Sequence, residues 1–339
     1  MSPSPLPETP RAVVLGSGSW GTALAALLVP NCESVTVYGN EQEALDAINE
    51  THTNPHYLPG VTLPESLAAS NDISVAADAD LILFVVPSSV TALVAGQLAG
   101  VLRNPDVVLL SCAKGIEMGT GRRMSQIIAD ALPGRHIAVL SGPTHAEEVS
   151  RSLATCTVVG SENEEVAKSL QTLLNAPHFR TYRSDDIAGM ELGGAIKNVF
   201  AIAAGCAKGL GLGDNAISAL VTRGLAEMTR LGVKLGGRPE TFMGLSGIGD
   251  LITTCFSHHS RNHRVGLALG QGKTLEEAQA ALGMVAEGVL NAESIHQAAE
   301  RAEVRSPLID AVYAILYQGK EARQVLNELL QRELRAENE

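Results

Sequence analysis

The chain has 339 residues, a net charge of −12, 45% hydrophobic residues and only 3% aromatic residues. This length predicts about two domains, with a large core built from small aliphatic side chains. The negative charge argues against nucleic acid and anionic membranes as general partners. It leaves room for a phosphorylated ligand, because a few local cations can hold one.

The cysteines and the N-terminal segment indicate the compartment. The five cysteines are far apart and form no Cys-x-x-Cys pair, which is typical of free thiols in a reducing compartment; they are Cys32, Cys112, Cys156, Cys206 and Cys255. No apolar run reaches membrane-spanning length, and the N-terminus lacks the pattern of a secretory signal. We expect a cytoplasmic protein without integral membrane contact, whose proline-rich residues 1–10 form a mobile tail.

The glycine-rich segment Gly16-Ser17-Gly18-Ser19-Trp20-Gly21 is the most informative motif. It follows the apolar run 11–15 and precedes a helix-like stretch at 22–29, which is the context in which G-x-G-x-x-G binds a dinucleotide. Gly16 permits the tight turn, Gly18 lets the backbone approach a pyrophosphate, and Gly21 lets the helix pack on the strand. The alternative is a glycine-rich turn of another α/β protein.

The first half of the chain alternates apolar runs with helical patterns. Six strands are predicted, at Ala12–Leu15, Ser34–Tyr38, Leu81–Val86, Val107–Cys112, Ile137–Leu140 and Thr155–Val159. Several are continuous and β-branched, as in a parallel sheet covered on both faces. We therefore expect residues 11–186 to form an α/β Rossmann-type dinucleotide-binding domain.

The second half has a different pattern. After about Asp186 the strand patterns end, and stretches rich in Ala, Leu, Glu and Gly follow, with breaks at 236–239 and 270–272. We expect residues 187–339 to form an all-helical substrate domain, ending in an amphipathic helix pair over Ala311 to Arg335.

Two lysines are candidates for the chemistry. Lys197 follows Gly193 and Gly194, which would lie beside it on a helix and leave a bare face. That face fits a ligand next to an ammonium group, or equally well close helix packing with Lys197 at its rim. Lys114 comes directly after a buried-type strand, at the edge of the sheet where ligands bind, although a solvated loop lysine has the same pattern.

Two further segments add charge to the second half. Ser260 is a good N-cap for a helix that reaches Leu269, with Arg261 and Asn262 in its first turn. Free N–H groups and a guanidinium there favour a phosphate site over an ordinary surface turn. Asp250 follows three glycines in an apolar setting, so it needs a cation or is simply a helix cap.

The histidines His258, His259 and His263 form a cluster in the sequence. No cysteine or carboxylate stands at ligand spacing, so we expect surface histidines and no metal site.

Taken together, these segments resemble one family, the bacterial NAD(P)-dependent glycerol-3-phosphate dehydrogenases. The resemblance covers nearly the whole chain after the tail and rests on the order and spacing of its motifs. These are Gly16–Gly21, Val86-Pro87-Ser88, Ala113-Lys114-Gly115, Ser141-Gly142-Pro143-Thr144, Gly193–Asn198, Gly249-Asp250-Leu251, Ser260-Arg261-Asn262 and Val285-Ala286-Glu287-Gly288.

The resemblance implies an oxidoreductase that interconverts dihydroxyacetone phosphate and sn-glycerol 3-phosphate, the backbone precursor of phospholipids. It implies NAD or NADP as cofactor and a site between a Rossmann domain and a helical domain. The expected partners are this small phosphorylated substrate and, as a possibility, a second copy of the chain in a homodimer. The alternatives are a related two-domain hydroxyacid dehydrogenase and a non-catalytic nicotinamide sensor.

Carried over by motif, the resemblance assigns roles to individual residues. It implies that Lys197 is the proton donor, that Lys114 is a second cation on substrate and cofactor, and that Asp250 positions Lys197. The other implied substrate contacts are Gly142, Thr144, Asn198, Thr254, Ser260, Arg261 and Asn262. The implied cofactor contacts are Gly16, Gly18, Ser19, Trp20, Gly21, Asn40, Lys114, Ala146, Arg261, Val285 and Glu287.

The chain departs from the family pattern in two places. His145 stands where a large apolar residue is usual, and Asn40 stands where a basic residue or histidine is often seen. The acid expected about 20 residues after the glycines is absent from residues 38–40, and Glu41 comes one step later. No Arg or Lys lies between Asn31 and Gly60 to hold a 2′-phosphate. The ribose rule therefore does not decide between NAD and NADP.

Overall fold

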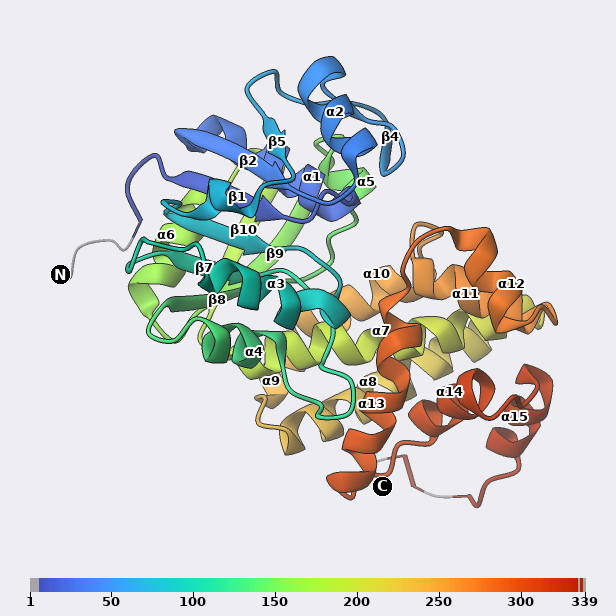
Figure 1. The fold of residues 1–339 in the computed structure, drawn as a ribbon. Helices are drawn as coiled ribbons and strands as arrows, with labels where there is room; N and C mark the ends of the chain where they lie inside the picture. The colour runs from blue at the N-terminus through green and yellow to red at the C-terminus, as the bar shows by residue number, and fades with distance from the viewer. Residues whose placement is uncertain (1–5, 335, 338–339) are drawn as a thin grey trace.

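A computed structural model describes residues 6–334 and 336–337 of the chain. One part is a twisted sheet covered by helices and the other is a set of packed helices, and Figure 1 shows the two parts side by side. The prediction of a Rossmann-type α/β domain followed by an all-α domain is confirmed.

The large sheet has eight strands in the order β10-β9-β8-β7-β6-β1-β2-β5. They are β1 (Arg11–Leu15), β2 (Ser34–Tyr38), β5 (Ala68–Ser70), β6 (Leu81–Phe84), β7 (Val108–Ser111), β8 (His136–Ser141), β9 (Thr155–Gly160) and β10 (Phe179–Ser184). All neighbouring pairs are parallel except β8 with β9. The chain leaves β1 toward β2 on one side and returns to β6 on the other. The carboxyl ends of β1 and β6 therefore form the switch point at which such sheets bind ligands.

Helices cover both faces of this sheet. They are α1 (Ser19–Leu28), η1 (Val29–Asn31), α2 (Gln42–Thr51), η2 (Ile73–Ala76), η3 (Ser88–Val90), α3 (Thr91–Ala99), α4 (Met124–Ala131), α5 (Ala146–Val149) and α6 (Glu164–Leu174). Neighbouring residues of one strand enter different cores: Leu110 packs in one cluster and Leu109 in the other. Burial on both faces explains why these strands are continuous apolar runs.

Four strands were not predicted from the sequence. Strands β3 (Thr53–Asn54) and β4 (Leu58–Thr62) form a small antiparallel pair, and β5 has three residues. Strand β10 is one of the two edge strands of the large sheet, and it alternates buried Phe179 and Thr181 with exposed Arg180 and Tyr182. Every second residue at its start is exposed, so β10 is not the continuous apolar run from which the other strands were predicted.

The predicted N-terminal tail differs in part from the structure. Met1–Pro5 lie outside the described residues. Leu6 is buried in the core cluster of the sheet, and Pro10 accepts a backbone hydrogen bond from Glu33 at 3.1 Å. The chain therefore joins the fold several residues before the first strand.

The helical part begins with α7, which two residues separate from the end of β10. Its elements are α7 (Ile187–Gly209), α8 (Asp214–Lys234), α9 (Pro239–Phe242), the π-helical turn η4 (Leu245–Gly249), α10 (Asp250–Phe256), α11 (Arg261–Gly270), α12 (Leu275–Leu282), α13 (Glu287–Arg301), α14 (Pro307–Tyr317) and α15 (Ala322–Leu330). Within the described residues no strand follows Ser184. The expected terminal helix pair corresponds to α14 and α15, and Arg335 lies outside the described residues.

Helix α7 is the central element of the helical part (Figure 1). Contrary to the expectation that no apolar run reaches membrane-spanning length, α7 is long and apolar enough to cross a membrane. However, 89% of its most apolar window is buried inside the protein. Its packing against α11 is backbone to backbone: a Cβ on Gly205 would lie 2.1 Å from the carbonyl oxygen of His263, and one on Gly266 would lie 2.0 Å from that of Ile202. This close approach fixes the start of α11 beside the middle of α7.

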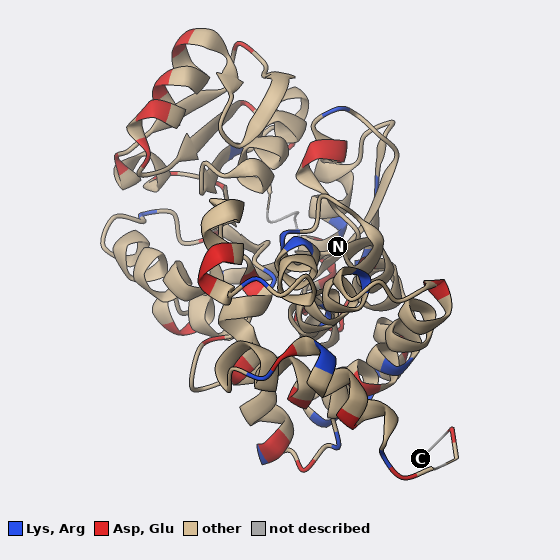
Figure 2. Cartoon of the chain, turned by 90° about the vertical axis from the view of Figure 1, so that its right-hand side faces the viewer, with Lys and Arg blue, Asp and Glu red and all other residues tan. Residues whose placement is uncertain are grey.

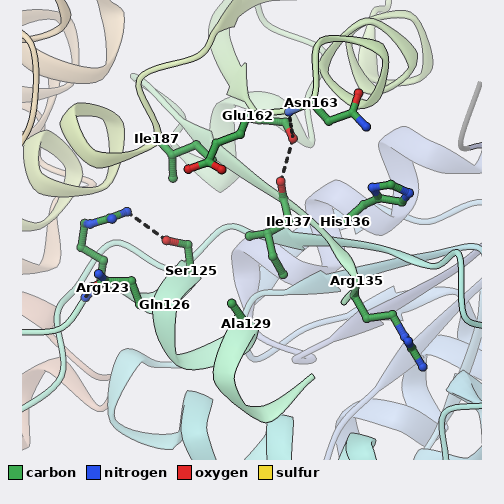
Figure 3. A pocket seen from close by; sticks show the side chains of 11 residues that line it. Arg123, Ser125, Gln126, Ala129, Arg135, His136, Ile137, Glu162, Asn163 and Ile187 are labelled. Carbon is green, nitrogen blue, oxygen red and sulfur yellow. Dashed lines mark hydrogen bonds between the residues drawn. The ribbon is translucent and has the colours of Figure 1, made fainter. Parts of the chain in front are cut away.

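A buried ion pair joins the two parts far from the switch point. The Arg123 guanidinium lies 2.7 Å from Oε2 of Glu191 on α7, and Ser125 donates to the same carboxylate through its N–H and its hydroxyl. Burial raises the pKa of Glu191, whereas Arg123 and the Ser125 donors oppose that rise. An open pocket of about 300 Å³ lies beside this contact, at the opposite edge of the sheet from the switch point. Figure 3 shows the Arg123 side chain directed at Ser125, and none of the predicted site residues lines this pocket.

Candidate active site

The glycine-rich turn connects β1 to α1 at the switch point. Gly16 has a φ of +126°, and a Cβ there would lie 2.9 Å from the carbonyl oxygen of Val85, which follows β6. A Cβ on Gly21 would lie only 1.9 Å from the carbonyl oxygen of Gly16. At Gly18, by contrast, a Cβ would meet no atom of the described residues within 4 Å. The fold itself thus requires Gly16 and Gly21, whereas the space beside Gly18 is open to a ligand.

The first turn of α1 fits the phosphates of a dinucleotide. Gly18 is the N-cap residue, and no side chain caps the helix. The first N–H groups of α1 therefore remain available to an anion at the positive end of the helix dipole. The Ser19 hydroxyl donates to the carbonyl oxygen of Tyr57 at 2.8 Å, which ties a distant loop to this turn.

Replacing Gly18 with alanine tests whether this glycine serves the cofactor and not the fold. Because Gly18 has φ −70° and ψ −178°, alanine fits the backbone without strain. We expect Gly18→Ala to keep the melting temperature of the wild type and to weaken NADH binding about tenfold or more, since a methyl group would occupy the approach to the pyrophosphate. Differential scanning fluorimetry and NADH titration measure the two quantities. Gly21→Ala is the contrasting variant, in which loss of stability is expected; unchanged NADH affinity in Gly18→Ala would refute the assignment.

A buried carboxylate joins the two candidate lysines. Asp250, the first residue of α10, is 2% exposed and accepts from Lys197 through Oδ1 at 2.7 Å and from Lys114 through Oδ2 at 2.9 Å. Lys197 also donates to the hydroxyl of Thr254 at 2.6 Å, and that hydroxyl donates to the backbone oxygen of Asp250. Lys114 further donates to the carbonyl oxygen of Gly142 at 2.7 Å. Two ammonium groups from different domains thus meet at one carboxylate.

Burial and the neighbouring charges determine the pKa values of Lys197 and Asp250. Burial lowers the pKa of Lys197 to about 8, although the negative charge of Asp250 opposes the decrease. Burial alone would raise the pKa of Asp250, but the two lysines hold it below its ordinary value. The site therefore contains an ionised acid and an amine that can exchange a proton near neutral pH.

The glycines before Lys197 serve close packing, not a ligand. A Cβ on Gly193 would lie 2.5 Å from the carbonyl oxygen of Ser246 in η4, and one on Gly194 would lie 3.2 Å from the Ser141 hydroxyl. The packing interpretation of the bare face is therefore correct, but Lys197 is not at its rim. It is 4% exposed and points at Asp250, which these close contacts bring within reach.

A chain of amides connects the lysine site to the start of α11. Asn198 donates to the carbonyl oxygens of Lys114 at 3.1 Å and Gly194 at 3.2 Å. Its own amide oxygen accepts from Asn262 at 2.9 Å, and the amide oxygen of Asn262 accepts from the N–H of Gly288. Both side chains are buried. These contacts fix the positions of Lys114 and of α11, so they give Asn198 and Asn262 a positioning role.

The helix α11 begins as the sequence predicts. Ser260 is its N-cap and accepts from the N–H of His263 at 3.2 Å. Arg261 is exposed, yet it interacts electrostatically with Glu287, Glu147 and Tyr57, two of which belong to the Rossmann domain. Its guanidinium therefore faces the space between the two domains. Figure 2 shows acidic segments spread over the outer helices of both domains, which leaves such local cations to attract an anion.

The remaining predicted cofactor residues lie around the same edge. Glu287, at the start of α13, accepts from the N–H and the hydroxyl of Ser88, which follows β6. Ala146 is buried at the start of α5, and Val285 is 41% exposed. Trp20 lies within the glycine-rich segment, in the first turn of α1, and Asn40 follows β2. Glu287 thus ties α13 to the Rossmann domain beside the switch point.

The structure adds to what the sequence indicates about His145, which stands out as a departure from the family pattern. Its Nε2 is buried and has no hydrogen-bond partner among the described residues, and its ring lies 5.8 Å from that of His259. Burial and the positive charges of Lys197 and Lys114 lower the pKa of His145. Of the three histidines expected at the surface, only His258 is exposed. Tyr57 was not predicted from the sequence, because no local pattern indicates a contact with Ser19, 38 residues away.

Family models and solved structures identify the chain. Residues 11–167 match the model of the NAD-dependent glycerol-3-phosphate dehydrogenase N-terminus, and residues 186–327 match that of its C-terminus. The chain belongs to this family. It is 44% identical to glycerol-3-phosphate dehydrogenase [NAD(P)+] of Enterococcus faecalis (97% of this chain and 98% of that protein) and 47% identical to that of Syntrophotalea carbinolica (96% and 98%). The crystal structure of glycerol-3-phosphate dehydrogenase from Coxiella burnetii superposes with a TM-score of 0.92 at 38% identity, covering 96% of this chain and 100% of that one.

The comparisons confirm three predictions that the sequence motifs gave for this member of the glycerol-3-phosphate dehydrogenase family. The family, the oxidoreductase class and the use of NAD or NADP were each expected from the sequence and are confirmed. The roles of individual residues remain predictions, which the geometry above makes testable.

Proposed function

We propose that this protein interconverts dihydroxyacetone phosphate and sn-glycerol 3-phosphate at the junction of its two domains, with Lys197 exchanging the proton. The supporting observation is the buried Lys197–Asp250–Lys114 cluster, which lies at the carboxyl ends of β7 and β8, on the same edge of the sheet as the glycine-rich turn. When bound there, the nicotinamide supplies or accepts the hydride. The residues Gly18, Ser19 and Trp20 would hold the phosphates of the cofactor at the start of α1.

The charge that develops on the substrate oxygen determines the role of Lys197. Reduction of the carbonyl builds negative charge on that oxygen, and a fixed ammonium stabilises it and then gives up a proton. Lys197 is suited to both tasks because it is buried and because its pKa, about 8, lies close to neutral pH. In the oxidation direction the neutral amine takes the proton from the hydroxyl group.

Asp250 and Lys114 support this exchange. Asp250 aims the Lys197 ammonium and keeps the lysine largely protonated, although burial favours the neutral amine. Lys114 is more accessible, with 18% of its side chain exposed, so its ammonium can contact substrate and cofactor from the Rossmann side. Thr144 and Gly142 orient that ammonium through their oxygens.

The substrate phosphate requires cations that the overall charge of −12 does not supply. We assign it to the first turn of α11, where Arg261 faces the domain junction and the N–H groups point outward from the helix. The Ser260 hydroxyl already caps His263, so its contribution is to fix the turn.

Two other functions make different demands on the site. A hydroxyacid dehydrogenase would need an anchor for a carboxylate in place of the phosphate site at α11. A nicotinamide sensor would need no buried proton donor next to the cofactor. The lysine cluster, with a basic helix start beside it, favours the phosphorylated substrate over both.

An absorbance assay tests the proposal. Mixing the protein with dihydroxyacetone phosphate and NADH or NADPH is expected to remove the nicotinamide absorbance in a substrate-dependent manner. A parallel assay with a panel of 2-keto acids, which a hydroxyacid dehydrogenase would reduce, is expected to give no turnover. Failure of both cofactors with dihydroxyacetone phosphate would disprove the activity, and binding without any turnover would support the sensor.

We further propose a cytoplasmic location and a role in supplying the glycerol backbone of phospholipids. The free cysteines and the burial of α7 support the location. A homodimer is proposed on the strength of the family resemblance alone, and light scattering of the purified protein tests it.

A further inference from the structure

The β3–β4 hairpin, Thr53–Thr62, holds one carbonyl group of the glycine-rich turn. Asn54 of β3 is fully buried, and its amide nitrogen Nδ2 donates to the carbonyl oxygen of Ser17 at 2.8 Å and to the hydroxyl of Thr22 at 2.9 Å. That hydroxyl donates in turn to the same carbonyl oxygen at 3.2 Å. Two buried side chains thus fix the Ser17 carbonyl, and one of them comes from a hairpin 37 residues further along the chain.

The same hairpin holds the other neighbour of Gly18. The Ser19 hydroxyl donates to the carbonyl oxygen of Tyr57, which lies in the hairpin turn, at 2.8 Å. The Tyr57 hydroxyl donates to Glu41 at 2.5 Å, which ties the turn to the start of α2. A Cβ on Gly18 itself would meet no atom of the described residues within 4 Å. The hairpin therefore fixes the backbone on both sides of Gly18 and leaves the approach to Gly18 open.

The fixed carbonyl of Ser17 determines where the N–H of Gly18 points. Both groups belong to one peptide unit, which is planar and, in the trans form, directs its C=O and its N–H to opposite sides. Because Asn54 and Thr22 hold the oxygen, this N–H points away from them. Within the described part of the chain, no backbone oxygen accepts from it. It is therefore a fixed and unused donor at the start of α1, where helices bind phosphate groups.

The buried amide of Asn54 is costly to the fold. Its Oδ1 atom is buried and has no hydrogen-bond partner among the described residues. The carbonyl oxygen of Ser17 can only accept, so the amide must turn its nitrogen toward it and leave Oδ1 unpaired. An unpaired buried polar atom lowers stability, whereas a leucine of similar volume would avoid that loss. What the amide supplies, and leucine could not, is the pair of hydrogen bonds donated to the turn.

We propose that Asn54 is a positioning residue for the cofactor: by holding the Ser17 carbonyl, it fixes the N–H of Gly18 as a donor to the pyrophosphate of the dinucleotide. A donor that is already oriented loses little freedom when the ligand binds, so it contributes more affinity than a mobile one. Asn54 acts through the backbone of the turn and touches no ligand. The inference rests on the proposed function only in requiring that a dinucleotide binds at Gly16–Gly21.

Direct binding to Asn54→Ala tests the inference. The single tryptophan, Trp20, lies in the glycine-rich segment and reports NADH binding through its fluorescence. We expect the variant to bind NADH about tenfold more weakly, and ADP, measured by competition, to lose affinity by a similar factor. Adenosine, which has no phosphate, should compete as well as it does with the wild type. In turnover, the KM for NADH should rise while kcat stays within about twofold.

Two further variants separate positioning from general stability. Asn49→Ala is the matched control, because the Asn49 side chain also holds a distant backbone segment through two hydrogen bonds, at Ala69 of β5. Its loss should leave NADH affinity unchanged. Thr22→Val removes the second donor to Ser17 with little change in volume, and we expect it to weaken NADH binding about threefold. Melting curves show which variants are folded, and Thr22→Val decides the question if Asn54→Ala does not fold.

Three results would overturn the inference. The first is an unchanged NADH dissociation constant in folded Asn54→Ala or, if that variant does not fold, in Thr22→Val. The second is an equal loss of affinity for adenosine, which would show a general distortion of the site. The third is an equal loss of NADH affinity in Asn49→Ala. Absence of NADH binding to the wild type would overturn the proposed function as well, whereas wild-type binding that the variants do not weaken leaves that function intact.

Discussion

Replacing Lys197 with methionine is expected to lower kcat/KM for dihydroxyacetone phosphate by about 10⁴-fold, because both the proton donor and the stabilising charge are lost. The affinity for NADH should stay within about twofold, since the Lys197 ammonium is bonded to Asp250 and Thr254 and to no residue of the glycine-rich turn. Steady-state kinetics and NADH titration give the two numbers. Methionine has a similar volume, which limits repacking in this buried position.

The control for this variant is Lys208→Met. Lys208 lies on the same helix in its last turn and is exposed, so its replacement should leave activity unchanged. The Lys197 variant leaves one oxygen of Asp250 without its ammonium, and a stability loss of about 1–3 kcal/mol is expected from that unmade bond. A loss of NADH affinity as large as the loss of turnover would show that Lys197 serves cofactor binding instead.

Asp250→Asn is expected to move the pH dependence of the reaction. In the wild type the rate of carbonyl reduction should fall as the pH rises through about 8, because Lys197 then loses the proton it donates. Asp250 raises the pKa of Lys197, so removing its charge lowers that pKa further. The falling limb of reduction, and the rising limb of oxidation, should both shift to lower pH by about 1 to 3 units.

Profiles of kcat/KM against pH in both directions measure this shift. At pH 7 the variant should also reduce its substrate about 100-fold more slowly, because Lys197 and Lys114 lose the carboxylate that orients them. Asp214→Asn, at an exposed helix start, is the matched control. If the limb stays in place in Asp250→Asn, the group that it reports is not Lys197, and the assignment of Lys197 as the proton donor would be contradicted.

The features that could be predicted from the sequence are those that depend on residues close together in the chain. Gly16 and Gly21 are required by backbone contacts within one strand–turn–helix unit, so their spacing is visible in the chain. Ser260 caps α11 as its residue type predicts, and doubly buried strands such as β6 and β7 appear as apolar runs.

The contacts that could not be predicted join residues distant in the sequence. Asp250 lies 53 residues from Lys197 and 136 from Lys114, and only the packing of η4 and α10 on α7 brings them together. The two glycines before Lys197 indicated that this part of α7 matters. They did not show whether a ligand or close packing fills the space beside them, and the structure shows close packing. The contact of Tyr57 with Glu41 likewise depends on the β3–β4 hairpin, for which the sequence has no strong pattern.

A crystal structure of the protein with NADH and a dihydroxyacetone phosphate analogue measures the central geometry most directly. We expect the Nζ atom of Lys197 about 3 Å from the analogue's carbonyl-position oxygen, still in contact with Asp250, with the nicotinamide ring on the other side of that carbon. A complex in which that oxygen contacts solvent or Lys114 alone, and Lys197 stays bonded only to Asp250 and Thr254, would contradict the role of Lys197 as proton donor.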